Sequence, residues 1–454
     1  MTAPASASAN DAVADLVDAA PIGPLHWRIL LICSAIMALD GFDLGLLGFV
    51  VPAMAADWSL PPSSFAFALS ASLIGVAFGS TIAGWMGDRL GRRTALLWMF
   101  VIGAAGSLLT VLCTDLGSLS VCRFITGFGM GGAIPNVIAL VTEFAPRRRR
   151  SFLVVLVYSM AALGSTGASM IAGPLIADWG WPSMFVVGGV LPLLVGAVAL
   201  FALPESVKFL LLSGRQPRTA ADLLQRLSGR AADDPALARA LQPPAPQAAA
   251  SPAADSSARM LFAGWLRWAT PLLWVAFIGT QALVFFNSSW LPTLLRTAGF
   301  SLQVAIQATG LFHFGSVVGG LLASWLAAHY PLSRLLALLY LLAALSLLAL
   351  GAEVRSVEVA YLLTFCAGFG VVGASFCLGA YASSCYADTV RARGVGWGLG
   401  IGRIGSISSP LLGGAALAAG YSVDTIIATL AIPAGVCCVV MLVISRLQPG
   451  RQRA

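Results

Sequence analysis

The chain is built from long, unbroken apolar runs joined by short polar connections. The runs do not show the alternation of apolar and polar residues that a membrane β-strand requires. About 20 apolar residues suffice for a helix to cross a bilayer, and a helix satisfies its own backbone hydrogen bonds in hydrocarbon. We therefore predict an all-α membrane protein with twelve transmembrane helices, over residues 27–52, 64–86, 94–113, 117–142, 152–177, 182–203, 268–292, 303–328, 332–351, 358–384, 394–419 and 423–446.

A polar stretch divides these twelve segments into two sets of six. It contains Pro243, Pro244 and Pro246 among many Ala and Ser residues, a composition typical of a linker. One short amphipathic helix is predicted within it, at 218–230. The expected organisation is an N-terminal tail (1–26), a first six-helix bundle (27–203), a cytoplasmic linker (204–266), a second bundle (267–446) and a C-terminal tail (447–454).

Composition excludes a soluble enzyme. Of all residues, 58% are hydrophobic and 10% are charged, whereas soluble domains carry about 25% charged residues. The net charge of +7 does not indicate nucleic acid, because the arginines lie in short loops between apolar runs. The eight cysteines lie inside apolar runs without metal-site spacing. We expect them to be packing residues, and we expect no metal and no cofactor.

The positions of the basic residues predict the orientation. With both termini in the cytoplasm, 22 of the 26 Lys and Arg residues fall on the cytoplasmic side. Only Arg296 and Arg355 fall outside, and Arg123 and Arg403 lie within segments. Basic residues concentrate in cytoplasmic loops, so this distribution favours cytoplasmic termini. The first 24 residues contain no Lys or Arg, which argues against a secretory signal and predicts a disordered cytoplasmic tail.

The loop after the second segment carries a motif, Gly84-Trp-Met-Gly-Asp88-Arg89-Leu-Gly91-Arg92-Arg93. Glycine allows the tight turn, and the aspartate can face an arginine or a helix N-terminus. An ordinary basic anchoring loop is the alternative. The motif resembles the signature loop of the major facilitator superfamily. We predict a cytoplasmic gate of Asp88, Arg89 and Arg92 together with Glu143, which would act through Arg92 or Arg148.

Further motifs narrow the resemblance. They are Asp40-Gly-Phe-Asp43, Arg123-Phe-x-Thr-Gly-x-Gly-x-Gly-Gly-Ala-x-Pro-Asn136, Leu203-Pro-Glu-Ser206, Ser289-Trp-Leu-Pro-Thr293 and Arg391-Ala-Arg-Gly-Val-Gly-Trp-x-Leu-Gly-Ile-Gly-Arg403. Together they resemble the aromatic acid:proton symporter family over nearly the whole chain. The resemblance implies two six-helix bundles in a bacterial inner membrane and inward transport of benzoate-like carboxylates with protons. One departure is Ala328-His329, where the family often repeats an Asp-Arg pair.

Two acidic residues interrupt the first apolar segment. Asp40 and Asp43 are three positions apart and therefore share one helix face. A carboxylate inside a membrane costs about 2.5–3.5 kcal/mol on insertion scales, which makes each a functional candidate. We predict that Asp40, Asp43 and Arg123 couple transport to protons, with an Asp43–Arg123 pair that opens on protonation. A permanent structural ion pair is the alternative.

The substrate site is predicted between the two bundles. Arg403 suits a carboxylate because its planar fork binds both oxygens. His313 is a candidate for hydrogen bonding to a ring hydroxyl, or alternatively for a contact between helices. Further candidates for the site are Asn136, Phe285, Phe286, Asn287 and Trp290, although Trp also occurs in interfacial belts.

Function classes other than symport of an aromatic acid remain open at this stage. They are a proton-driven exporter of amphiphilic drugs, a carrier for another small organic acid and a non-transporting sensor. Nucleotide-driven pumping is not indicated, since the chain has no GxxxxGK[ST] loop. Two GxGxxG strings lie inside spanning segments and are discarded. The partners expected are a small aromatic carboxylate, protons and the lipid bilayer, with the protein as a monomer.

Overall fold

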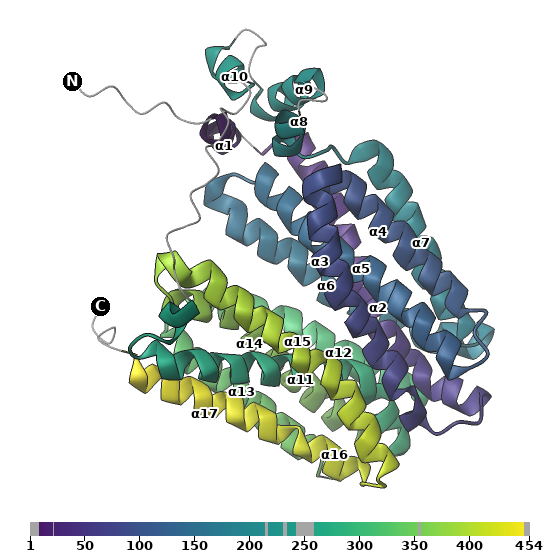
Figure 1. Ribbon diagram of the computed structural model, residues 1–454. Helices are drawn as coiled ribbons and strands as arrows, with labels where there is room; N and C mark the ends of the chain where they lie inside the picture. Colours follow the sequence, from purple (N-terminus) through teal and green to yellow (C-terminus); the bar gives the residue numbers. More distant parts are fainter. Residues whose placement is uncertain are drawn as a thin grey trace.

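The computed structural model describes residues 9–20, 22–213, 217–229, 234–241, 258–352 and 356–448. Two helical bundles are arranged as the arms of a V (Figure 1). The short helices that follow the first bundle and precede the second along the chain lie at one end of the molecule. We call this end the linker end and the opposite end the far end.

Each bundle contains six helical spans. The first bundle comprises α2 (Pro24–Asp57), α3 (Ala66–Leu90, preceded by the 3-10 turn Pro62–Phe65), α4 (Arg92–Thr110), α5 (Leu116–Phe144), α6 (Arg147–Trp179) and α7 (Pro182–Ala202). The second comprises α11 (Leu266–Thr297), α12 (Leu302–Leu326), α13 (Leu332–Leu350), α14 (Val357–Cys385), α15 (Asp388–Ala418) and the broken span α16 (Val423–Thr429) with α17 (Ala431–Leu447).

Within the described residues, eleven spans are long and apolar enough to cross a membrane. The twelfth span is α15, which has 31 residues and packs beside α11. It is less apolar because it carries Arg391, Arg393 and Arg403 and many glycines. The predicted all-α fold with two six-helix bundles is confirmed.

Close helix pairs recur in the two bundles. A Cβ at Gly75 or Gly79 of α3 would lie 2.2 or 2.0 Å from a carbonyl oxygen of α5. At Gly315 and Gly319 of α12 a Cβ would lie 2.3 Å from a carbonyl oxygen of α14 in each case. Small residues therefore let α3 approach α5, and α12 approach α14, backbone to backbone.

The bundles contact each other through α2 with α11, α3 with α15 and α6 with α12. Ser70 of α3 donates to the carbonyl of Ile407 of α15 at 2.9 Å. Thr166 of α6 donates to the carbonyl of Gly310 of α12 at 3.4 Å. These residues lie in the far-end halves of their helices. The arms of the V are thus joined at the far end and diverge toward the linker end (Figure 1).

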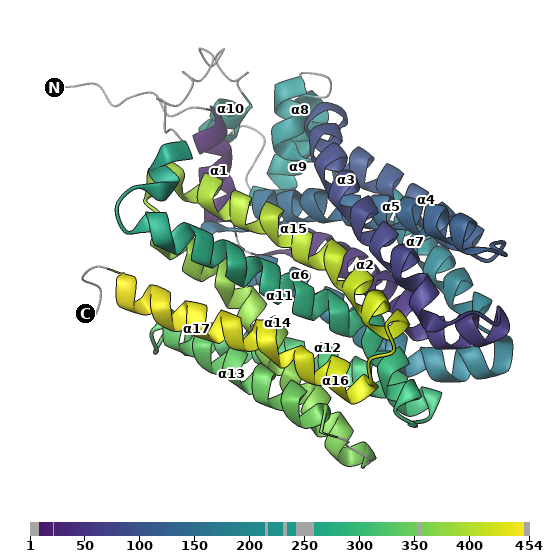
Figure 2. The ribbon, with the colours of Figure 1, turned by 60° about the horizontal axis from the view of Figure 1, so that its bottom comes forward.

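The linker end is covered by short helices, namely α1 (Ala9–Ala19), α8 (Val207–Ser213), α9 (Pro217–Ser228), α10 (Pro235–Ala240) and the 3-10 turn Ala258–Phe262. Helix α9 occupies the position predicted for a short helix at 218–230. The helices α1 and α10 lie side by side (Figure 2). Pro243, Pro244, Pro246 and the C-terminal residues 449–454 lie outside the described residues.

The prediction of a disordered N-terminal tail was wrong for residues 9–19, which form α1. Leu16 is buried in the apolar cluster of the first bundle, and Val17 is also buried. Asp18 pairs with Arg147 at 3.0 Å and accepts a hydrogen bond from its backbone N–H at 2.6 Å. The apolar residues of α1 recur with helical spacing, and this short amphipathic pattern outweighs the polar composition of the segment.

Candidate functional site

An ion pair lies at the centre of the first bundle. Arg123 of α5 donates through both terminal nitrogens to Asp43 of α2, at 2.9–3.0 Å. Arg123 is 1% exposed and Asp43 is 5% exposed. The Phe185 ring lies 5.7 Å from the guanidinium carbon. The structure therefore brings together two residues that lie 80 positions apart, and burial of both charges makes each dependent on the other.

Asp40 lies almost one turn before Asp43 and, unlike Asp43, is partly exposed. It interacts electrostatically with Asp43 and with Arg403 of α15, across the boundary between the bundles. Asp40 and Arg403 each lie roughly 23 Å along their helices from the linker end, at 1.5 Å per residue. An acid from one bundle and a cation from the other therefore lie at similar depth and interact electrostatically without forming an ion pair among the described residues.

Arg403 is partly exposed. In the part of the chain that the structure describes, no carboxylate forms an ion pair with it. Its planar fork of donors is thus available to a carboxylate ligand at mid-depth.

Tyr158 of α6 completes this group, and sequence reasoning missed it. It interacts electrostatically with both Asp40 and Arg403. It is 44% exposed, and its ring meets Phe376 of α14 edge to face with centroids 6.0 Å apart. A hydroxylated aromatic residue inside a spanning segment was the only signal in the sequence. We call Asp40, Tyr158, Phe376 and Arg403 the mid-depth cluster.

Two further residues predicted to bind substrate, His313 and Asn287, lie closer to the far end. His313 is buried, with Nε2 3.4 Å from Ser288 Oγ of α11. Asn287 is buried, donates to the Leu283 carbonyl at 2.7 Å and leaves its Oδ1 without a partner in the described chain. Both are polar groups near the contact between α11 and α12, and their part in substrate binding stays a prediction.

Of the three aromatic residues of α11 that were predicted to bind substrate, two are packed into the protein. Trp290 is fully buried and donates its indole N–H to the Pro410 carbonyl at 2.9 Å. Phe286 is also buried, and a Cβ at Gly413 would contact both rings. Phe285 is partly exposed. Trp290 and Phe286 thus join α11 to α15, and of the three aromatic residues only Phe285 retains a partly accessible ring.

Asn136 lies away from the mid-depth cluster. It is fully buried and donates to the Ala83 carbonyl at 3.1 Å, and a Cβ at Gly87 would lie 2.1 Å from its Oδ1. The structure therefore places Asn136 against the last turns of α3, next to Asp88, and not among the residues around Arg403. Small residues at 83 and 87 are what allow α5 to approach α3 at this level.

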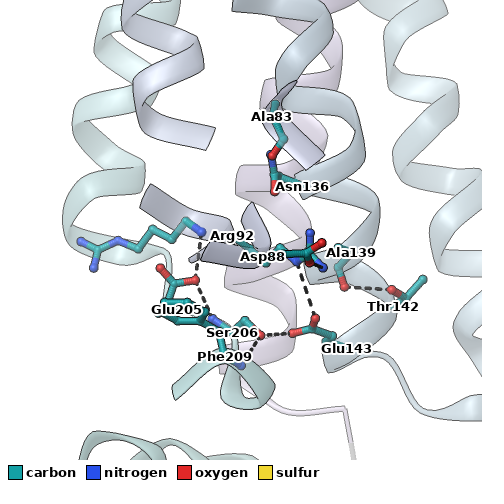
Figure 3. A network of polar contacts seen from close by, with 11 residues as sticks. Ala83, Asp88, Arg92, Asn136, Ala139, Thr142, Glu143, Glu205, Ser206 and Phe209 are labelled. Atoms are coloured by element: carbon teal, nitrogen blue, oxygen red, sulfur yellow. Dashed lines mark hydrogen bonds and ion pairs between the residues drawn. The ribbon is translucent and has the colours of Figure 1, made fainter. Parts of the chain in front are cut away.

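A polar network surrounds the Asp88 motif at the linker end (Figure 3). Arg92 bonds Asp88 at 2.5 Å and lies 4.0 Å from Glu143 of α5. Glu143 also accepts a hydrogen bond from Ser206. These residues line a pocket of about 470 Å³ together with Arg89 and Lys208. Of the two arginines proposed as partners of Glu143, the structure brings Arg92 to it, whereas Arg148 is exposed.

Glu205 also belongs to this network, although it was not predicted to be part of the gate. It accepts from the backbone N–H of Arg93 at 3.0 Å and of Thr94 at 3.4 Å, and so caps the start of α4. Gly91 has φ +102°, and a Cβ there would lie 2.4 Å from a Glu205 oxygen. The acid at the end of the first bundle is thereby tied to the motif more than 100 positions earlier.

Arg89 and His329 form no ion pair with this network among the described residues. Arg89 stacks on Trp85, with its guanidinium carbon 4.5 Å from the ring centroid. In the second bundle the corresponding loop holds His329, whose Nδ1 lies 3.2 Å from the Trp325 carbonyl of its own helix. The second loop therefore lacks the acid–arginine arrangement that Asp88 and Arg92 make in the first.

Comparison with known proteins identifies the family. Residues 33–386 match the Major Facilitator Superfamily. The chain belongs to this superfamily. It is therefore a membrane transporter and not an enzyme.

Related transporters of this superfamily match along almost the whole chain. The chain is 33% identical over 432 residues to the 4-hydroxybenzoate transporter PcaK of Pseudomonas putida, covering 95% of each protein. It is 34% identical over 426 residues to the gallate transporter of the same species, covering 93% of this chain and 92% of that protein.

Solved structures show the same fold. The xylose transporter XylE of E. coli in its inward open conformation matches with a TM-score of 0.70 and 17% identity. The match covers 94% of this chain and 98% of that one. The twelve-span facilitator fold is thus supported by structure as well as by sequence.

Proposed function

We propose that this transporter carries a small aromatic carboxylate into the cell together with a proton. The observation that supports this most strongly is the mid-depth cluster, where the Tyr158 ring of one bundle contacts the Phe376 ring of the other, and Asp40 and Tyr158 interact electrostatically with Arg403. The substrates named for PcaK and the gallate transporter are aromatic carboxylic acids, in agreement with this chemistry.

The cluster offers complementary groups for such a substrate. Arg403 would bind the carboxylate, because a desolvated anion needs a fixed cation and a guanidinium can pair with both oxygens. The rings of Tyr158 and Phe376 would flank the aromatic ring, and the Tyr158 hydroxyl would hydrogen-bond a polar substituent. A cationic drug would meet a guanidinium here, which disfavours the exporter alternative.

Asp40 and Asp43 would provide the proton coupling. Asp40 is the accessible acid beside the substrate site, and Asp43 holds Arg123. When a proton binds to this pair of acids, the Asp43–Arg123 bond weakens, and the α2–α5 packing around it can rearrange. In this mechanism a change of charge next to the substrate is converted into movement of the first bundle.

Alternating access would exchange the contacts at the two ends. The bundles touch at the far end and diverge at the linker end, which fits access from the linker side. The distribution of basic residues favours a cytoplasmic linker, so the present arrangement would face inward. Opening outward would require Ser70–Ile407 and Thr166–Gly310 to separate and the network of Asp88 and Arg92 to close against the second bundle.

Uptake into proteoliposomes under an imposed pH gradient tests this proposal. Radiolabelled 4-hydroxybenzoate should accumulate when the outside is acidic. Competition with benzoate, dihydroxybenzoates and phenylpropionates would rank the substrates. Accumulation that needs no pH gradient would refute symport. Competition by cationic amphiphiles and not by carboxylates would refute the substrate class and favour export of drugs.

A further inference from the structure

A second cleft lies at the linker end, remote from the mid-depth cluster. It measures about 300 Å³ and opens between the start of α2, the end of α7 and helix α9. Three guanidinium groups line it, from Arg28 of α2, Arg93 of α4 and Arg226 of α9. The transport mechanism proposed above gives no role to these three guanidinium groups.

The arginines of the cleft outnumber its acids by three to two. Two acids share its lining, Glu205 and Asp222, but Glu205 is engaged in capping α4. Among the described residues none of the three arginines forms an ion pair. Arg93 donates to the Leu200 carbonyl, and its Nε is buried without a partner there. The cleft therefore holds a surplus of cationic donors.

The cleft borders a surface that faces lipid. Phe201 lines it and is 87% exposed. Leu194 and Val198 lie on the same face of α7 and are also exposed. On α2, Trp27 and Leu31 are exposed beside Arg28. Since α2 begins and α7 ends here, the arginines lie where the apolar span meets the headgroup layer.

We propose that this cleft binds the phosphodiester headgroup of an anionic glycerophospholipid. Guanidinium groups bind phosphate oxygens through paired hydrogen bonds, and clusters of basic residues at a membrane interface attract anionic lipids. The acyl chains would lie along the exposed apolar face of α7. Because Arg93 and Glu205 both border the cleft, a bound lipid would hold α2, α4, α7 and α9 together beside the Asp88 network.

Binding of fluorescent phosphatidylglycerol to the purified full-length protein in phosphatidylcholine nanodiscs tests this inference. The double variant Arg28→Gln/Arg226→Gln should bind it about 30-fold more weakly, from the usual gain per basic residue near an anionic surface. Arg218→Gln is the matched control, since Arg218 is an exposed arginine on α9 that does not line the cleft. It should bind as the wild type does.

Thermal unfolding in pure phosphatidylcholine provides a check on folding. Arg28 and Arg226 are exposed, so the double variant should unfold at the wild-type temperature there and lose only the stabilisation by phosphatidylglycerol. Equal stabilisation of double variant and wild type would overturn the proposal. Equal stabilisation of the wild type by inorganic phosphate would also overturn it, because the site would then bind a soluble anion and not a lipid.

Discussion

The ring of Tyr158 on α6 meets the ring of Phe376 on α14 edge to face, with centroids 6.0 Å apart. This contact crosses from one bundle to the other near Asp40 and Arg403. Rings at such a boundary can separate to admit an aromatic substrate between them. The relationship gives Tyr158 two separable contributions, a ring face and a hydroxyl group.

Tyr158→Phe keeps the ring and removes the hydroxyl. We expect the KM for uptake of a hydroxybenzoate to rise about tenfold, since a hydrogen bond to a charged or polar partner contributes about 1.5 kcal/mol. Tyr158→Leu should weaken binding further. Tyr421→Phe is the control, because Tyr421 is exposed at the far end. Unchanged KM values in both Tyr158 variants would remove this residue from the substrate site.

Asp40→Asn keeps the shape of the side chain but cannot exchange a proton. We expect this variant to lose accumulation driven by a pH gradient while it still exchanges internal for external substrate at equal pH. The comparison of gradient-driven uptake with counterflow measures this difference. Asp424→Asn, at the start of α16, is the control. Normal uphill accumulation by Asp40→Asn would exclude Asp40 from the proton path.

Arg403→Ala removes the cation proposed to hold the carboxylate. The loss of a charge-assisted bond to a desolvated anion costs about 2–3 kcal/mol, or roughly 30- to 150-fold in affinity. Arg403→Lys should fall between wild type and Arg403→Ala, because a point charge replaces a fork. Calorimetry with the acid and its neutral amide measures both effects, with Arg446→Ala as control. If Arg403→Ala bound the acid as tightly as wild type, Arg123 would become the candidate.

Asp88→Ala should slow the change between inward and outward forms and leave substrate affinity intact. Asp88 is largely exposed, and an exposed ion pair contributes about 0.2–1 kcal/mol, so the exchange rate should change by up to about fivefold. Exchange kinetics and equilibrium binding are measured on the same preparation. Asp178→Ala, an exposed acid at the far end of α6, is the control. Loss of binding with normal exchange would contradict the gate.

The predicted orientation, with the linker in the cytoplasm, can be tested with introduced cysteines that react from outside the cell. Arg218 is an exposed residue of α9, and Ala419 is exposed just after the far end of α15, so Arg218→Cys and Ala419→Cys place one thiol at each end of the molecule. In intact cells an impermeant thiol reagent should label the second and not the first, compared with the parent protein. The reverse pattern would place the linker outside the cell.

The spanning helices could be predicted from sequence because hydrocarbon demands continuous apolar runs, whatever the tertiary contacts. The same demand made Asp40, Asp43, Arg123 and Arg403 stand out. An Asp43–Arg123 pair was also predicted, and the structure forms it. The cost of placing polar groups in hydrocarbon acts on each helix separately, so its effects can be predicted from one sequence.

Contacts between distant elements were much harder to predict. Tyr158 is a site candidate because of its interactions with residues of α14 and α15, and Glu205 because it accepts a hydrogen bond from the start of α4. Neither partner is indicated by a local pattern. Asn136 has the polarity expected of a ligand, yet Gly87 lies directly against it. α1 was missed because a helix of 11 residues gives a weak periodic signal until its neighbours bury it.

Charge balance at the membrane centre has an electrical consequence. Asp40 and Asp43, when ionised, are matched by Arg123 and Arg403, so the empty carrier holds no net charge among these four residues. Binding of one substrate carboxylate together with one proton leaves this net charge unchanged. Moving a unit charge through a potential of 100 mV involves about 2.3 kcal/mol. With balanced charges that work vanishes on both the loaded and the returning step, and the cycle would be insensitive to voltage.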